Sequence, residues 1–178
     1  MVIHLIKILV LFLIYSLFGT ALHFLFKLSN KSVVIGIIAS VNESVWEHIK
    51  LLLTPIFVYS FVEFLIDKEH NFFVLSLELL LSIILIVIFY EIKIKIFKNK
   101  YGFINIISFL ITSFIIAIVH YNLRSLNVSN TINGISLIIV IVIFIMYLTF
   151  TVFPPKIKYF KDPITGTYGI NEYVNKSV

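Results

Sequence analysis

Repeated apolar runs of about twenty residues constrain the fold of this 178-residue chain more than any other feature. Hydrophobic residues make up 60% of the sequence and charged residues only 13%. Such a run crosses a bilayer as a helix, because its backbone hydrogen bonds are satisfied inside the segment. The sequence therefore predicts an all-α integral membrane protein with one helical bundle over residues 1–155, in contact with membrane lipids. The expected spans are residues 5–28, 45–66, 72–92, 103–121 and 132–153.

Two segments outside these spans have different expected roles. The segment from Val33 to Val41 is apolar but too short to cross a bilayer, so it is predicted to be re-entrant or to lie at the interface. The polar tail, residues 156–178, is too short to form a core of its own. Its turn-forming residues make it a candidate to fold back onto the bundle.

The distribution of basic residues predicts the orientation. With the amino terminus outside, eleven of the fourteen Lys and Arg residues lie on the inner side, where basic residues concentrate. Nucleic acid binding is not expected, because the lysines flank apolar runs and form no basic stripe with interleaved aromatics. The chain has no cysteine, which excludes disulfides and thiolate metal ligands. The strongest basic group follows the third span and contains Lys93, Lys95, Lys98 and Lys100.

The densest polar segment is residues 40–50, SVNESVWEHIK, which includes the only tryptophan of the chain. A single helix through residues 33–53 would bury its charged residues, at about 2.5 to 3.5 kcal/mol each near the bilayer centre. The segment is therefore predicted at the inner membrane surface. There Trp46 and Lys50 would lie at the level of the lipid headgroups. Its polar residues are Asn42, Glu43, Glu47, His48 and Lys50.

Two chemical roles are conceivable for this segment, and the sequence does not decide whether the protein is an enzyme. In the first, Glu43 and Glu47 join His23 to hold a divalent metal ion that activates water. In the second, His48 acts as a general base beside Glu47, oriented by Asp162 of the tail. Either arrangement would suit a hydrolase or transferase that acts on lipid head groups.

A structural role for the same residues is favoured over both. Acidic residues in the first turn of a helix complement its dipole, and a Glu-to-Lys spacing forms a surface pair. An assembly role would make the tail or the Trp46 face an exposed contact surface for a protein partner or a second copy.

Ionisable residues inside the spans suggest a third class, a small cation or proton transporter. Glu78 lies inside the third span and is expected to pair with His120 or Arg124, and Glu63 lies in the second span. The transport hypothesis predicts a polar cavity that reaches from Glu78 toward the inner face, and a close-packed bundle there would argue against it. The alternative for Glu78 is snorkelling to the interface, and for Glu63 a packed polar contact with Tyr59.

The chain also resembles a known family. Residues 42–50 (NESVWEHIK), residues 153–155 (FPP) and residues 160–170 (FKDPITGTYGI), with Gly19 and His23, are similar to a family of small bacterial membrane proteins of unknown function. The resemblance covers nearly the whole chain and implies a polytopic protein of the bacterial cytoplasmic membrane. It implies no activity and no catalytic residues.

Overall fold

The structure is a computed structural model that describes residues 2–67, 71–97 and 102–176. Five of its helices, α1, α3, α4, α5 and α6, are long and apolar enough to cross a membrane. The described residues form no strand beyond one isolated bridge, so the predicted all-α membrane fold is confirmed. The elements are α1 (Val2–Leu28), α2 (Val33–Ile38), α3 (Val45–Asp67), α4 (Phe72–Phe97), α5 (Phe103–Leu123), α6 (Asn130–Thr149), the 3-10 helix η1 (Lys158–Phe160) and α7 (Gly169–Lys176).

The helix ends differ modestly from the predicted spans. The third spanning helix continues to Phe97 rather than ending at residue 92, so Lys93 and Lys95 belong to it. The last spanning helix ends at Thr149 rather than at residue 153. Lys98 and Lys100, which contribute to the predicted orientation, lie outside the described residues.

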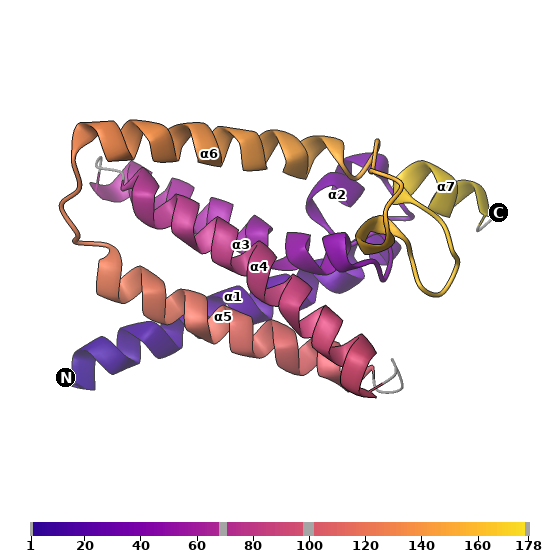
Figure 1. Cartoon of the computed structure of the whole chain (residues 1–178), viewed down its shortest axis with the longest axis horizontal. Coiled ribbons are helices and arrows are strands. Elements are labelled where there is room, and N and C mark those ends of the chain that lie inside the picture. Colours follow the sequence, from indigo (N-terminus) through magenta and orange to yellow (C-terminus); the bar gives the residue numbers. More distant parts are fainter. Residues whose placement is uncertain (1, 68–70, 98–101, 177–178) are drawn as a thin grey trace.

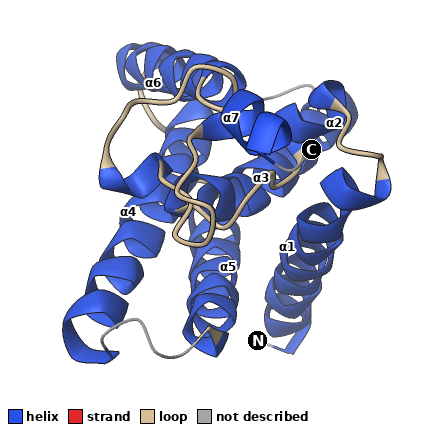
Figure 2. Cartoon of the chain, turned by 90° about the vertical axis from the view of Figure 1, so that its right-hand side faces the viewer, coloured by secondary structure: helices blue, strands red, loops and turns tan. Residues whose placement is uncertain are grey.

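Four of the spanning helices form a ring. α1 packs against α3 and α5, and α4 packs against α3 and α5, so each helix contacts two neighbours. α6 packs along α4, outside the ring (Figure 1). The view along the bundle in Figure 2 shows α6 at one edge and the tail lying across α3.

The bundle has two distinct ends. Its N-terminal end holds the start of α1, the end of α3, the start of α4 and the α5–α6 connection, and its C-terminal end holds α2 and the tail (Figure 1). The segment predicted as re-entrant forms the short helix α2 at the C-terminal end.

The close contact between α1 and α3 depends on Pro55 and Gly19. Pro55 lies inside α3 and has no N–H to donate to the carbonyl of Leu51. α1 approaches this carbonyl at Gly19, where an added Cβ would lie only 2.5 Å from the Leu51 oxygen. Because glycine has no side chain, the two backbones can pack at this point.

Candidate functional site

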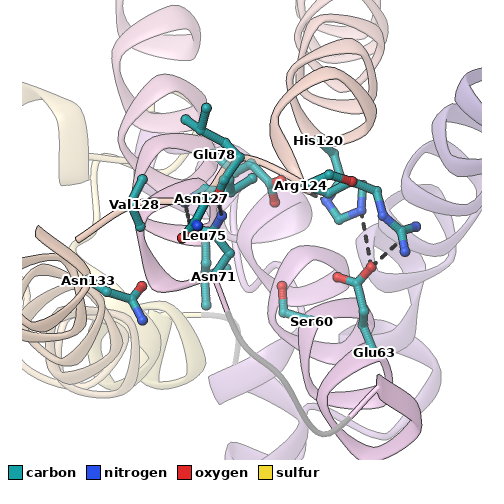
Figure 3. A pocket seen from close by; sticks show the side chains of 13 residues that line it. Ser60, Glu63, Asn71, Leu75, Glu78, His120, Arg124, Asn127, Val128 and Asn133 are labelled. Atoms are coloured by element: carbon teal, nitrogen blue, oxygen red, sulfur yellow. Dashed lines mark hydrogen bonds and ion pairs between the residues drawn. The ribbon is translucent and has the colours of Figure 1, made fainter. Parts of the chain in front are cut away.

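A polar pocket of about 550 Å³ opens at the N-terminal end of the bundle. It lies between α3, α4 and α5 and is bordered by the α5–α6 connection, as Figure 3 shows. Its volume is in the range of small-molecule sites. The lining residues are Ser60, Glu63, Asn71, Val74, Leu75, Glu78, His120, Arg124, Ser125, Leu126, Asn127, Val128 and Asn133.

Two carboxylates and one imidazole meet in this pocket. His120 Nδ1 lies 2.8 Å from Glu78 Oε1, and both side chains are buried. On the other side of the ring, His120 Nε2 lies 3.5 Å from Glu63 Oε1 (Figure 3). An imidazole can donate and accept, so these three groups can exchange a proton with one another. We call them the Glu63–His120–Glu78 cluster.

The pairing of Glu78 with His120 confirms one sequence prediction and excludes its alternative. Glu78 is 1% exposed, so it does not snorkel to the interface. Its second oxygen, Oε2, is buried and has no hydrogen-bond partner. Buried carboxylate oxygens ordinarily accept hydrogen bonds, so this atom marks a place for a donor.

The rim of the pocket carries a positive charge and several amides. Arg124 lies 3.5 Å from Glu63 Oε1 and is partly exposed. Asn71 directly precedes α4 and donates through Nδ2 to the carbonyl of Leu126 at 2.8 Å, which fixes the α5–α6 connection. The charged cluster is therefore inside the pocket, with Arg124 nearer to its mouth.

Below the cluster the bundle is closely packed. Leu79, Ile116 and Ala117 are fully buried beneath the pocket. The transport hypothesis predicts a cavity that reaches from Glu78 toward the predicted inner face, and no such cavity is found there among the described residues. The cavity instead opens at the opposite, N-terminal end, where the end of α3, the start of α4, the end of α5 and the α5–α6 connection line it.

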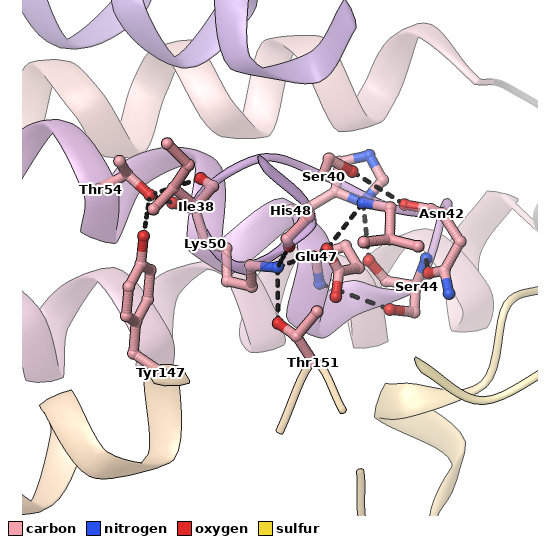
Figure 4. A network of polar contacts seen from close by, with 12 residues as sticks. Ile38, Ser40, Asn42, Ser44, Glu47, His48, Lys50, Thr54, Tyr147 and Thr151 are labelled. Atoms are coloured by element: carbon pink, nitrogen blue, oxygen red, sulfur yellow. Dashed lines mark hydrogen bonds and ion pairs between the residues drawn. The ribbon is translucent and has the colours of Figure 1, made fainter. Parts of the chain in front are cut away.

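At the C-terminal end, Lys50 is the centre of a buried polar network (Figure 4). Its Nζ donates to the carbonyl of Gly36 (2.7 Å), to Glu47 Oε2 (2.9 Å) and to Thr151 Oγ1 (2.7 Å). Glu47 Oε2 also accepts from the backbone N–H of Val41 at 2.9 Å. An ammonium group has three donors, and all of them are used here. Lys50 therefore holds together α2, α3 and the segment after α6.

The predicted position of Lys50 is thus wrong. Lys50 has no exposed surface, so its amine is not available to lipid headgroups, and its pair with Glu47 is internal rather than on the surface. The physical reason is that α2 and the segment directly after α6 lie against the start of α3 and supply acceptors for the amine. Asn42 is buried in the same region and accepts from the backbone N–H of Ser44 through Oδ1 at 2.9 Å.

The tail folds back onto the bundle and covers Trp46. The Trp46 ring stacks on Phe160 with centroids 5.2 Å apart and meets Phe150 edge-on at 5.4 Å. Trp46 is only 4% exposed, so the expected exposed contact face at this residue is absent. Lys158 donates to Glu91 Oε1 of α4 at 2.5 Å, and this hydrogen bond raises the pKa of Lys158.

The proposed metal ligands are divided between two places. His23 Nε2 lies 3.6 Å from Glu43 Oε1, and His48 Nε2 lies 3.5 Å from Glu43 Oε2. Glu47 is not among them, because it is bound to Lys50 and Val41. No group of three or more His, Asp or Glu side chains within the described ranges is arranged to hold a metal ion.

The predicted pairing of His48 with Asp162 is also not formed. Asp162 is buried in the tail, where its carboxylate accepts from the backbone N–H groups of Ile164 and Thr165. His48 Nδ1 instead lies 2.9 Å from the carbonyl of Ser44. Asp162 therefore shapes the turn of the tail, and the cavity beside His48 has a volume of only about 40 Å³.

Several residues in or beside the pocket and the Lys50 network cannot be singled out from the sequence. Thr151, which binds Lys50, is an ordinary hydroxyl residue just after α6. Tyr15 lies in the middle of α1, is completely buried, and has a hydroxyl without a hydrogen-bond partner. For Asn71 the only signal is its place at the start of a helix.

The fold and the buried ionisable groups define a multi-pass, all-helical integral membrane protein. A family model described as "Family of unknown function (DUF6512)" matches residues 2–170, and the chain belongs to this family. No curated protein and no solved structure matches the chain.

Proposed function

We propose that the protein is a membrane transporter for a small solute, and that protons take part in binding at the Glu63–His120–Glu78 cluster. The observation that carries the proposal is the buried Glu78–His120 pair in an open pocket of about 550 Å³. Ionisable side chains within membrane spans are costly, and they commonly mark solute or proton pathways.

The open and the closed end of the bundle fit a transport cycle in which the site is accessible from one side of the membrane at a time. The pocket is open at the N-terminal end, and the Lys50 network and the tail close the C-terminal end. Solute release on the second side would require these contacts to rearrange. Transporters of this kind expose one site alternately to the two sides of the membrane.

We further propose that the protein lies in the bacterial cytoplasmic membrane with the amino terminus outside and the carboxyl terminus inside. The distribution of eleven Lys and Arg residues on one side and three on the other supports this orientation. The pocket would then face the external medium. The Lys50 network would lie on the cytoplasmic side.

Uptake by proteoliposomes tests the transport proposal. Purified protein is reconstituted and given a pH gradient and one of three radiolabelled probes: methylammonium, glycine or glucose. We expect at least one probe to accumulate in response to the gradient. Uptake should be lost in Glu78→Gln, which removes the charge that faces the pocket.

Glu91→Gln is the matched control, because it is the same substitution on the same helix at the opposite end. Glu91 forms a partly exposed ion pair with Lys158, so its loss should have little effect on stability. Unfolding temperatures in detergent identify variants that fail to fold, and Glu63→Gln at the partly exposed side of the cluster provides a second test. Uptake of every probe at the rate of empty liposomes would contradict the proposal.

A further inference from the structure

We infer that the ligand of the pocket is a small organic cation with a primary ammonium group, which binds at Glu78 in competition with a proton. This inference rests on the proposed function and names the substrate class of the same pocket. Its evidence is the charge of the cluster, the free carboxylate oxygen of Glu78 and the mixed lining of the cavity.

The charges of the pocket favour a monovalent cation. Glu63 and Glu78 together carry two negative charges when unprotonated, and Arg124 supplies one positive charge. With His120 neutral, the net charge of the pocket is −1 when no proton is bound to the cluster. It is zero when one proton is bound. A cation and a proton therefore neutralise the pocket equally well, and each must weaken the binding of the other.

The free oxygen of Glu78 favours a cation that donates hydrogen bonds. Oε1 is engaged by His120 at 2.8 Å, whereas Oε2 is buried without a partner. A primary ammonium brings three N–H donors, and a charge-assisted hydrogen bond to a carboxylate is among the stronger ones in proteins. A quaternary ammonium has the same charge but no donor, so it would leave Oε2 unsatisfied.

A second buried acceptor lies on the side of α1. The hydroxyl of Tyr15 is buried without a hydrogen-bond partner. The Tyr15 ring meets Tyr59 edge-on at 6.0 Å, and Tyr59 meets His120 edge-on at 5.2 Å. These rings connect α1 to the cluster, although neither tyrosine lines the pocket itself.

The rest of the pocket fits a short carbon chain. Val74, Leu75 and Val128 supply apolar surface beside the charged cluster, and Asn71 and Asn127 supply polar surface near the mouth. An alkali ion would gain nothing from the apolar side. An organic ammonium places its nitrogen at Glu78 and its carbon atoms against these side chains.

The proton dependence of binding belongs to the cluster as a whole. Lowering the pH adds a proton to one of its three groups and removes the negative charge that attracts the cation, so affinity must fall. The other titratable and charged groups in or beside the cluster are Tyr15 from α1, Tyr59 from α3, and Tyr121 and Arg124 from α5.

Binding measurements with three probes test the inference. Purified protein in detergent is titrated with ethylammonium, tetramethylammonium and rubidium by calorimetry, at a series of pH values from about 6 to about 10. Ethylammonium should bind more tightly as the pH rises. Glu78→Gln should weaken it roughly tenfold to hundredfold, the range for a lost hydrogen bond to a charged group, while Glu91→Gln should not change it.

The other probes separate the alternatives. Equal binding of tetramethylammonium would show that charge alone is recognised, and stronger binding of rubidium would show an alkali-ion site; either result overturns the inference. If glycine or glucose is transported in the liposome assay and ethylammonium does not bind, the proposed function stands and the substrate class is wrong. If Glu78→Gln reduces the unfolding temperature sharply, the affinity for ethylammonium is compared in Glu63→Gln instead. Glu63 is partly exposed and belongs to the same cluster, so this variant should also bind ethylammonium more weakly.

Discussion

Replacing Lys50 with methionine should destabilise the protein by about 3 to 5 kcal/mol, the usual cost of breaking a buried ion pair from one side. Methionine nearly fills the volume of the lysine but leaves Glu47, which is 1% exposed, without a counter-charge. The carbonyl of Gly36 and the hydroxyl of Thr151 also lose their donor. The measurement is thermal or denaturant unfolding in detergent micelles.

The double variant Glu47→Gln with Lys50→Met separates charge from packing. A glutamine keeps an acceptor for the backbone N–H of Val41 and carries no charge, so no unpaired ion remains in the interior. We therefore expect the double variant to be more stable than Lys50→Met alone. Equal stability of the two variants, or an unchanged unfolding transition in Lys50→Met, would show that the ion pair does not hold this end of the bundle together.

The residues around Lys50 show how much of this polar network can be predicted from the sequence alone. The density of polar residues at 42–50 located an important segment correctly, because charged residues beside an apolar run are expensive unless something compensates them. The compensation itself was not predictable. It comes from Gly36, fourteen positions before Lys50, and from Thr151, far along the chain, and neither residue type signals such a contact.

One part of the pocket, the Glu78–His120 pair, can be predicted from a different feature of the sequence. Glu78 and His120 are isolated ionisable residues inside apolar runs, and a buried carboxylate needs a partner, so their pairing followed from the sequence. The sequence also placed Glu63 in the same candidate path and offered Arg124 as an alternative partner of Glu78, but it did not indicate that Arg124 pairs with Glu63 or that the cavity opens at the N-terminal end. Those features depend on how α3, α4 and α5 rotate about their axes, which apolar runs without a polar face do not specify.

The sequence predicts which segments form spanning helices better than it predicts where those helices end. The apolar runs identify five spans because the bilayer sets their length. The sequence does not predict the extension of α4 to Phe97, because a lysine after an apolar run usually marks the membrane edge. In the structure Lys93 is buried and donates to Asn105 Oδ1 of α5 at 2.9 Å, so a lysine can lie within the helical bundle.

Replacing Gly169 with alanine should undock the tail from the C-terminal end. Gly169 has φ +59°, and an added Cβ would lie 2.6 Å from the carbonyl oxygen of Thr151 and 2.9 Å from Pro154. The left-handed backbone costs an L-residue about 1 to 2 kcal/mol, and overpacking adds about 1 to 3 kcal/mol. The next residue, Ile170, is fully buried and donates to the same Thr151 carbonyl at 2.9 Å, so the strain falls on the docking contact itself.

Trp46 is the natural probe for this change because it is the only tryptophan in the chain and stacks on Phe160 of the tail. Undocking should shift its fluorescence to longer wavelength and make the tail sensitive to protease. Gly166→Ala is the matched control. Gly166 has φ +73°, but an added Cβ would meet nothing closer than 3.8 Å, so this variant is destabilised only by the left-handed backbone and not by crowding. If both variants shift the emission equally, crowding at Thr151 is not what secures the tail; if neither does, the tail is held by its other contacts, such as Lys158 with Glu91.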